Sequence, residues 1–395
     1  MKKNILLFLF LTNQLVFGQT LNIGEVNAKD YYEEVDFEFI INKIVVPVEI
    51  NNRTYKFIID TGAPNLISNE LYELLNPKFI DTIPTYDGND KKENLKIVSI
   101  EKLKLGNLEF FNTATLVQNF SPDNPLRCLG LDGFLGSNML RNSIVQFDLK
   151  NKKVRITNDK KKLNIKKKNS SEIKLSKVQS NPYAIIDLIG KDKSREYVII
   201  DTGMDGLYDL SKNNYKIFSQ KNIFREIGKS SGSSSFSLFG SSQSGDQYKL
   251  LLPQMKINKF TVQDLITITG NHDNSRIGAE LLKYGVLTID YIDKRFYFEP
   301  TEDTVKIHHE DFGFSRTLSN GNLIVGFVWD DELKNKISNG DIILEINNKP
   351  FKVCELLTTK NNFKENKKLE LKIEKSDGKV IKLIVEKKNY SQHRL

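Results

Sequence analysis

The chain contains 395 residues, more than one hydrophobic core accommodates, so we expect two or three domains. Its 39% hydrophobic and 27% charged residues are typical of a folded globular protein and exclude a disordered one. The formal net charge of +8 is not focused in one place, and two lysine runs, residues 160–162 and 166–168, contain no aromatic residue. These runs indicate a solvated connector, and we predict no nucleic-acid site.

The first 18 residues differ from the rest of the chain. Lys2 and Lys3 precede an apolar run at residues 5–11, and a second short apolar patch ends at Gly18. A basic start, an apolar centre and a small residue at the end predict a signal peptide at residues 1–18. A buried strand or a membrane anchor is the alternative, although the run is short for crossing a bilayer. We therefore expect export to the periplasm or the exterior, with no transmembrane anchor after signal removal.

The next part of the chain contains an internal repeat. Residues 55–68 and 197–211 each run from apolar β-branched residues through Asp-Thr-Gly to further apolar residues, and their aspartates lie 141 positions apart. Residues 136–140 have a counterpart 142 positions later, and each segment is predicted to open a short helix. The chain therefore contains two copies of a mainly β unit, which we place at residues 35–158 and 173–300.

The two Asp-Thr-Gly sequences contain Asp60 and Asp201. One such tripeptide is weak evidence, because Asp and Gly also serve ordinary turns. At equivalent places of a repeated unit, however, the two loops can meet about a pseudo-twofold axis. The paired carboxyl groups then share one proton, so that one activates water and the other donates to a scissile carbonyl, without a metal or cofactor. The glycines of the two loops, Gly62 and Gly203, permit tight turns. The threonines, Thr61 and Thr202, can reach the backbone of the opposite loop.

At these residues the chain resembles the pepsin and retropepsin group of aspartic peptidases, over about residues 35–300. The matching segments are Asp60-Thr61-Gly62-Ala63, Asp201-Thr202-Gly203, Phe134-Leu135-Gly136 and, less closely, Arg276-Ile277-Gly278. The resemblance implies a two-lobed β-barrel pseudo-dimer in which Asp60 and Asp201 are the catalytic pair. It also implies that Thr61 and Thr202 interlock the lobes. Met204 and Arg276 depart from the family pattern, which favours weak or specialised activity.

The same family covers its cleft with a flexible hairpin flap. In the first copy the candidate is residues 84–95, where Tyr86 and Gly88 have suitable character. In the second copy the equivalent segment is the Ser- and Gly-rich stretch 229–246, whose composition suits a mobile loop. A solvated connector is an equal alternative for these segments, so Tyr86 is the only individual flap residue that we predict.

A third unit, at residues 305–388, follows the repeat. Its run Asn339-Gly340-Asp341-Ile342-Ile343-Leu344-Glu345-Ile346-Asn347, and a later hairpin turn at residues 376–379, resemble bacterial PDZ domains of mixed α and β structure. This resemblance implies that a peptide adds as a strand to the sheet edge, with its C-terminal carboxylate bound by Phe312, Gly313 and Phe314. The alternative is a domain that only packs against the rest. His308 and His309 lack metal-ligand spacing, so we predict no metal site.

The leading hypothesis from the sequence is an exported aspartic endopeptidase that acts on polypeptides, best below neutral pH. The alternative is a pseudo-peptidase that binds peptides without cleaving them. Cys128 and Cys354 lie far apart in sequence and are expected in separate domains, so we do not predict a disulfide scaffold.

Overall fold

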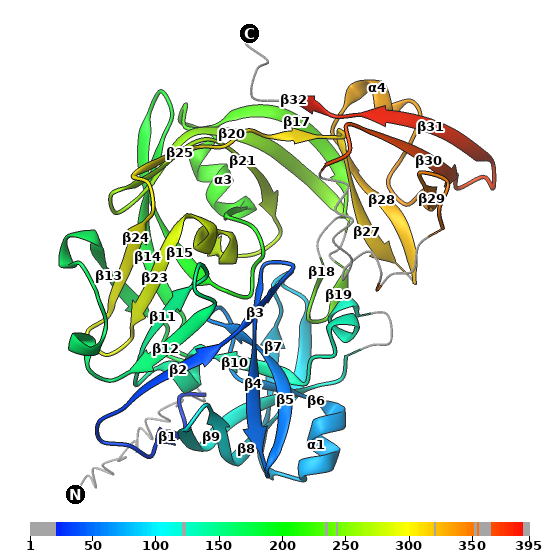
Figure 1. Ribbon diagram of the computed structural model, residues 1–395. Coiled ribbons are helices and arrows are strands. Elements are labelled where there is room, and N and C mark those ends of the chain that lie inside the picture. The colour runs from blue at the N-terminus through cyan, green and yellow to red at the C-terminus, as the bar shows by residue number, and fades with distance from the viewer. Residues whose placement is uncertain are drawn as a thin grey trace, which may run out of the picture.

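Figure 1 shows the protein as a computed structural model that describes residues 21–120, 124–233, 236–241, 244–319, 321–350, 354 and 365–389. The predicted signal peptide, residues 1–18, lies outside the described residues. The structure is mainly β, as the alternating and β-branched segments predict. In the described part of the chain, no helix is both long and apolar enough to cross a membrane.

The first lobe (residues 25–140) is built on a nine-stranded sheet in the order β1-β9-β6-β10-β5-β4-β8-β7, with β3 beside β4. The bounds of its elements are β1 Glu25–Val26, β3 Glu38–Ile40, β4 Lys43–Ile50, β5 Arg53–Asp60, β6 Leu66–Ser68, α1 Asn69–Leu75, β7 Lys78–Tyr86, β8 Lys92–Leu105, β9 Leu108–Gln118, η1 Pro125–Leu129, β10 Gly133–Gly136 and α2 Ser137–Leu140. Asn51 and Asn52, with φ of 50° and 60°, form the tight turn between β4 and β5. Asparagine tolerates this left-handed conformation, which two-residue hairpins require.

The second lobe (residues 170–306) belongs to a fourteen-stranded sheet in the order β17-β20-β21-β16-β22-β15-β14-β13-β24-β23-β11-β12-β2, with β25 beside β21. The bounds are β2 Tyr32–Asp36, β11 Ile144–Asp148, β12 Lys153–Thr157, η2 Lys160–Lys162, η3 Lys167–Asn169, β13 Ser170–Leu175, β14 Pro182–Ile189, β15 Lys193–Asp201, β16 Tyr208–Ser211, α3 Lys212–Phe218, β17 Arg225–Gly232, β20 Gly245–Ile257, β21 Phe260–Gly270, β22 Arg276–Gly278, η4 Ala279–Tyr284, β23 Gly285–Asp290, β24 Arg295–Pro300 and β25 Thr304–Lys306. A separate short hairpin joins β18 (Phe236–Ser237) to β19 (Gly240–Ser241). The predicted short helices after residues 136 and 278 are present as α2 and η4.

β11, which follows the first lobe in the chain, pairs with β23 of the second lobe and so joins the first copy of the repeat to the fourteen-stranded sheet. These strands occupy equivalent places in the two sequence repeats, and they run antiparallel, with Val145 opposite Ile289 and Phe147 opposite Leu287. Antiparallel pairing of equivalent strands has a local twofold axis. One hydrophobic core continues across both lobes, so the ends of β5 and β15 are held in fixed relative positions.

The C-terminal unit (residues 310–389) has a core of its own, around Val325, Ile343 and Leu371. Its five-stranded sheet has the order β27-β28-β29-β30-β31, and β26 pairs with β32. The bounds are β26 Glu310–Asp311, β27 Phe314–Ser319, β28 Asn322–Val328, α4 Asp331–Lys334, β29 Ile342–Ile346, β30 Lys368–Glu374, β31 Val380–Glu386 and β32 Lys388–Asn389. The predicted hairpin turn at residues 376–379 joins β30 to β31, with Gly378 at a φ of 82°. β25 still pairs with β21, so residues 304–306 belong with the second lobe.

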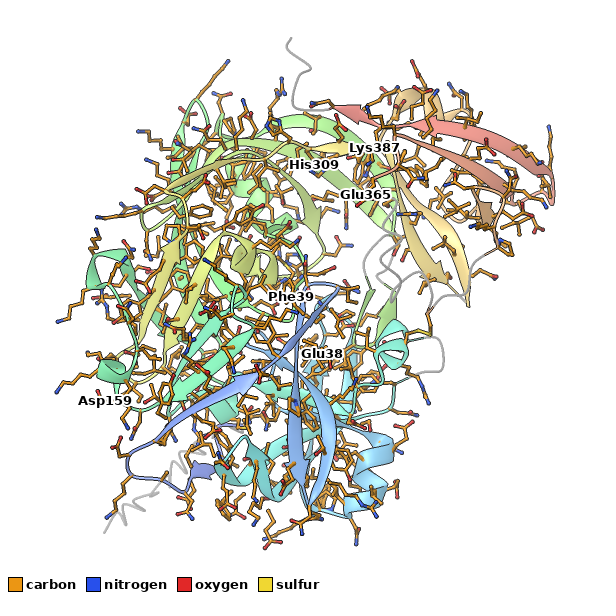
Figure 2. The ribbon with its side chains drawn as sticks, viewed as in Figure 1. Glu38, Phe39, Asp159, His309, Glu365 and Lys387 are labelled. Carbon is orange, nitrogen blue, oxygen red and sulfur yellow. A yellow bond between two sulfur atoms is a disulfide. The ribbon has the colours of Figure 1, made fainter. Side chains whose placement is uncertain are left out.

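A buried ion pair joins the C-terminal unit to the second lobe. Lys249 of β20 is almost fully buried, and its ammonium group contacts the carboxylate of Asp311 in β26. His309, which Figure 2 labels at this junction, lies 3.4 Å from the same carboxylate. A buried ammonium group requires such a partner because desolvation disfavours its charged form. The pair therefore fixes where β26 meets the second lobe.

A disulfide connects the C-terminal unit to the first lobe, and this corrects the expectation from the sequence. Cys128 in η1 is bonded to Cys354, with their Cα atoms 5.0 Å apart. The two residues are 226 positions apart along the chain, and this separation was the reason for predicting no disulfide scaffold. Distance along a chain does not limit distance in space once three units pack around a common cleft. The C-terminal unit is therefore tied to both lobes.

Candidate active site

The two Asp-Thr-Gly loops begin where two equivalent strands end. Asp60 is the last residue of β5 and Asp201 the last of β15. β5 runs parallel to β10, and β15 runs parallel to β22, which places Gly136 beside Asp60 and Gly278 beside Asp201. A Cβ atom on either glycine would lie 2.2–2.3 Å from the backbone of the adjoining loop. Because Gly136 and Gly278 have no side chain, the backbone of each aspartate loop can pack directly against them.

The threonines of the two loops form a reciprocal set of hydrogen bonds. Thr61 Oγ1 donates to the carbonyl of Ile200 at 2.5 Å, and Thr202 Oγ1 donates to the carbonyl of Ile59 at 2.8 Å. Each hydroxyl oxygen also accepts from the backbone N–H of the other threonine, at 3.0 and 3.1 Å. Both side chains are buried. Because each loop satisfies buried polar groups of the other, the loops hold a fixed mutual position.

The carboxyl groups of Asp60 and Asp201 meet and form a hydrogen bond. Gly62 N–H donates to Asp60 Oδ1 and Gly203 N–H donates to Asp201 Oδ1, both at 2.9 Å. Each glycine also approaches the opposite carboxyl group, because a Cβ on Gly62 or Gly203 would lie within 2.5 Å of an atom of that group. The loops can therefore cross only with glycine at both positions.

Burial changes the acidity of this pair. Desolvation raises the pKa of Asp60, the charge of Asp201 raises it further, and together they bring it to about 8 against the opposing effect of Lys43. Two carboxyl groups in contact do not ionise together easily, so one proton stays between them. At neutral pH Asp60 retains its proton.

Lys43 is a site residue that the sequence did not reveal. It opens β4, its side chain is 13% exposed, and its ammonium group donates to the carbonyl of Gly203 and lies 3.7 Å from Asp205. Lys43 thus connects the first lobe to the second. Asn181, just before β14 of the second lobe, connects the second lobe to the first: it donates to the carbonyl of Thr61 at 3.3 Å. A lysine before an apolar strand is common, so only the packing of the lobes assigns Lys43 to the site.

The two departures from the family pattern both contact Asp201. The backbone N–H of Met204 donates to Asp201 Oδ1 at 3.1 Å, so the main chain supports the carboxylate where a hydroxyl side chain is lacking. Nη1 of Arg276 lies 3.7 Å from Asp201 Oδ2. Neither residue separates the two carboxyl groups. Arg276 instead places a positive charge next to one of them.

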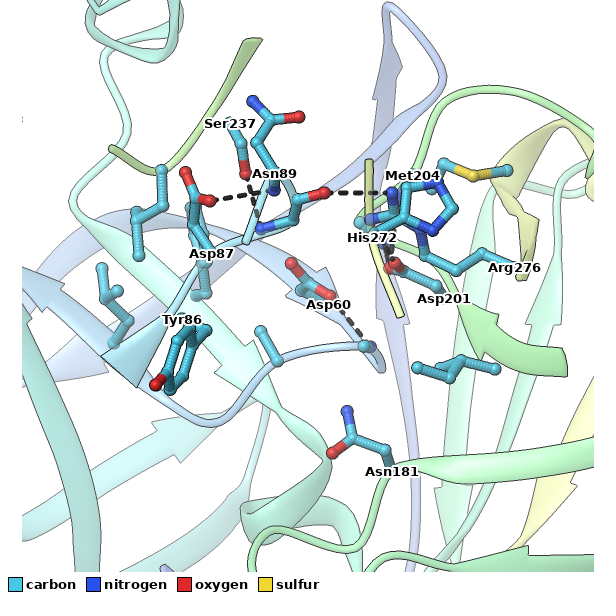
Figure 3. Close-up of a pocket in the computed structure, with 18 of the residues that line it drawn as sticks. Asp60, Tyr86, Asp87, Asn89, Asn181, Asp201, Met204, Ser237, His272 and Arg276 are labelled. Atoms are coloured by element: carbon cyan, nitrogen blue, oxygen red, sulfur yellow. Dashed lines mark hydrogen bonds and ion pairs between the residues drawn. The ribbon is translucent and has the colours of Figure 1, made fainter. Parts of the chain in front are cut away.

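A cavity of about 1270 Å³ contains the aspartate pair and is lined by all three units. Figure 3 shows Asp60 and Asp201 within it, with Tyr86 and Asp87 on one side and Arg276 on the other. Tyr86, the predicted flap residue, ends β7 and is 61% exposed. The C-terminal unit contributes residues at and after β27: Arg316, Thr317, Leu318 and Leu323.

The two predicted flap segments meet over the cavity. The turn between β7 and β8 contacts the β18–β19 hairpin of the second lobe: Gly88 N–H donates to Ser237 Oγ, and the N–H of Phe239 donates to Asp87 Oδ2, both at 2.9 Å. Asn89 adds a bond to the carbonyl of Gly240 at 3.4 Å. Leu238 and Phe239 of the same hairpin also pack against a core cluster of the first lobe, so the two segments are joined by apolar as well as polar contacts.

The residues predicted to bind a peptide carboxylate lie elsewhere. Phe312 and Phe314 are buried in the core of the C-terminal unit, and none of the three residues lines the cavity. The N–H of Gly313 already donates to Asp311 Oδ1 at 2.8 Å, while its carbonyl accepts from the amides of Trp329 and Asp330. The structure therefore does not bring this loop together with the aspartate pair.

One family model matches part of the first lobe. A family model described as aspartyl protease matches residues 46–139, the segment that includes Asp60 and the Phe134-Leu135-Gly136 element. A search of curated proteins finds no match. Among solved structures, a retropepsin-like aspartic protease from Rickettsia conorii matches 34% of this chain and 96% of its own, with 16% identity and a TM-score of 0.24.

A second solved structure, Basic 7S globulin from soybean, matches 69% of this chain and 97% of its own, with 10% identity and a TM-score of 0.39. The family match, which covers the loop of Asp60, is the finding that bears on chemistry. It supports a peptidase-like function for this protein and, by that chemistry, a polypeptide substrate.

Proposed function

We propose that the protein is an exported aspartic endopeptidase in which Asp60 and Asp201 hydrolyse peptide bonds. The observation that carries the proposal is the contact between the two carboxyl groups, with the pKa of Asp60 raised by burial to about 8. A largely desolvated pair of carboxyl groups at the end of two crossed loops has no evident structural purpose, because removing such groups from water costs stability. It is suited to acid–base chemistry on a bound water.

The proposed reaction uses both members of the pair. A carboxylate at Asp201 accepts a proton from water as the water oxygen attacks the carbonyl carbon of the peptide bond. Asp60 donates its proton to the carbonyl oxygen, which gives a tetrahedral gem-diol. The C–N bond then breaks as Asp201 gives its proton to the amine nitrogen and Asp60 takes a proton back from one gem-diol hydroxyl, which leaves a carboxylic acid and an amine and restores the pair. The loop amides of Gly62 and Gly203 keep the carboxyl groups oriented throughout.

Cleavage is expected to persist at neutral pH and to fall above about pH 8. Below the pKa of Asp60, which is about 8, the acid needed for the carbonyl oxygen is present; above it the pair carries two charges and no proton. This range extends above the acidic optimum expected from sequence. The measurement is the pH dependence of kcat/KM on quenched peptides, with circular dichroism at each pH as the control for folding. A basic limb well below neutrality in a folded enzyme contradicts the assignment.

We further propose that the C-terminal unit is a PDZ-like domain that recruits the polypeptide being cleaved. Support comes from the predicted turn motifs and from β27, an edge strand whose residues line the cavity of the aspartate pair. An extended peptide can add to such an edge through main-chain hydrogen bonds. Binding of a terminal carboxylate at Gly313 would require Asp311 to release that amide, so strand addition along β27 is the better supported mode.

A charge placed on β27 is expected to weaken cleavage of long substrates only. Leu318→Asp puts a carboxylate at the part of the cavity wall that β27 supplies, so KM for an unfolded protein should rise about ten-fold while KM for short peptides stays near wild type. Ile384→Asp is the matched control, because Ile384 lies on the far edge strand β31 and is exposed. Equal effects on long and short substrates would contradict recruitment by β27.

The alternative function is binding of a peptide without hydrolysis. It predicts that a peptide bound in the cavity is recovered intact after prolonged incubation, as mass spectrometry would reveal.

Export remains part of the leading proposal: residues 1–18 have the pattern of a signal peptide, and the Cys128–Cys354 bond is of a kind that persists in oxidising compartments. We expect the mature protein in the periplasm or outside the cell.

A further inference from the structure

Arg276 occupies a place that is apolar in the first lobe. In β22 it lies one residue before Ile277, and in β10 the corresponding residue is Phe134. Phe134 is buried among apolar side chains, including Phe120 and Leu131. The equivalent side of the second lobe instead contains a guanidinium group, which is 17% exposed and lines the cavity. A cation in this position needs carboxylate or carbonyl groups nearby, whereas Phe134 in the first lobe needs only apolar neighbours.

Those partners belong to three different parts of the site. Nη2 of Arg276 lies 2.9 Å from Asp209 Oδ2 and donates to the carbonyl of Gly88, at the tip of the first-lobe flap, at 3.2 Å. Nη1 lies 3.7 Å from Asp201 Oδ2. One planar group therefore contacts the aspartate pair, a wall of the cavity and the flap that covers it.

The flap tip is shaped for this contact. A Cβ on Gly88 would lie 2.9 Å from Nη1 of Arg276 and 2.9 Å from Ser237 Oγ. A larger residue would therefore require the guanidinium group and the Ser237 hydroxyl to shift. Glycine at this position brings the carbonyl of residue 88 within reach of Arg276.

Asp209 keeps the guanidinium group in place. Asp209 Oδ2 also lies 2.8 Å from His272 Nε2, and His272 Nδ1 lies 2.8 Å from the carbonyl of Asn274. Burial raises the pKa of Asp209, but His272 and Arg276 more than offset this, so its pKa is lowered. Asp209, Asp201 and Asp60 act on the charge of Arg276, and Arg276 in turn acts on Asp90, which also feels Asp87, His272 and Asp273. Lys43 acts on Asp60.

We propose that Arg276 is a positioning residue that couples closure of the first-lobe flap to the charge of the aspartate pair. Its guanidinium group holds the carbonyl of Gly88 over the cavity, and its positive charge lies 3.7 Å from Asp201 Oδ2, on the second-lobe side of the pair. The second lobe thereby supplies the base and the first lobe the acid. The inference rests on the proposed peptidase function and assigns the two roles within it.

The test is the pH dependence of kcat and KM for Arg276→Met and Arg276→Lys on a quenched peptide. Removing a cation close to a carboxylate is expected to move the acidic limb of kcat/KM upward by about 1–3 pH units. Arg276→Met should also raise KM several-fold, because the flap loses its contact. Arg276→Lys should keep the acidic limb near wild type and raise KM alone. Arg155→Met is the matched control, since Arg155 pairs with Asp148 and Glu34 away from the cavity.

The results separate this inference from the proposed function. If Arg276→Met leaves both the acidic limb and KM at wild-type values, the inference is overturned while peptidase activity stands. If Asp60→Asn cleaves as fast as wild type, the proposed function fails and the inference fails with it. Should Arg276→Met not fold, Gly88→Ala disturbs the flap contacts with Arg276 and Ser237 and leaves the charge next to Asp201 in place: a raised KM with an unchanged acidic limb supports the flap role of Arg276, and an unchanged KM refutes it.

Discussion

Asp60→Asn is expected to lower kcat by roughly 10²- to 10⁴-fold, because the variant cannot transfer a proton to the carbonyl oxygen of the substrate. The substitution is nearly isosteric, and asparagine Oδ1 can still accept from the N–H of Gly62, as Asp60 Oδ1 does at 2.9 Å. The geometry of the crossed loops should therefore survive. Asp201→Asn should have a comparable effect on kcat, because it removes the proposed base.

The same Asp60→Asn variant is expected to be more stable than wild type at neutral pH. The pKa of Asp60 is about 8 in the folded protein, whereas an unfolded aspartate has a pKa of about 3.9. Between these values the unfolded chain binds fewer protons than the folded one, so wild-type stability falls as pH rises. Asparagine does not titrate. The advantage of the variant should therefore be absent at acidic pH and grow by up to about 1.4 kcal/mol per pH unit.

The measurement combines kcat on quenched peptides with the unfolding midpoint in urea at several pH values. Asp132→Asn is the matched control: burial also raises the pKa of Asp132, but this residue does not line the cavity. It should keep wild-type kcat. Undiminished hydrolysis by Asp60→Asn would remove Asp60 from the mechanism. Equal midpoints of Asp60→Asn and wild type across the pH range would contradict the raised pKa.

Loss of the Cys128–Cys354 bond is expected to cost about 2–5 kcal/mol of stability. The bond closes a loop across 226 positions, so its removal frees many conformations of the unfolded chain. The double variant Cys128→Ser/Cys354→Ser should release the C-terminal unit first, because that unit has its own core. Since β27 lines the cavity, KM for an unfolded protein should rise as well.

Trp329 offers a direct readout of this release. It is the single tryptophan of the chain, it is buried, and a Cβ on Gly228 of the second lobe would lie 3.6 Å from its side chain. Its fluorescence should therefore change when the C-terminal unit separates from β17. The fluorescence of Trp329 in wild type under reducing conditions should match that of the double variant. Reductant should leave the fluorescence and urea midpoint of the double variant unchanged. Identical urea midpoints for oxidised and reduced wild type would contradict the prediction.

The sequence alone was enough to predict a mainly β chain, the short helices after residues 136 and 278, and the hairpin turn at residues 376–379. It also marked Asp60 and Asp201 as a candidate pair. These features depend on local patterns, such as left-handed turns and strand periodicity, and on the constant offset between repeats. A constant separation between the two copies of the repeat predicts that their equivalent loops lie next to each other, without any knowledge of how the lobes pack.

Only the tertiary structure decided what surrounds the two aspartates. Lys43 comes from a strand with no distinctive motif and reaches Gly203 of the other lobe because the lobes dock across β11 and β23. Asp209 and Arg276 meet beside Asp201 within the second lobe, where β16, β22 and β15 are neighbours in one sheet. The disulfide and the place of β27 beside the cavity depend in the same way on how the C-terminal unit packs. Contacts between segments far apart in sequence are set by docking, and a linear pattern does not encode them. The aspartate pair was visible in the sequence; its electrostatic surroundings were not.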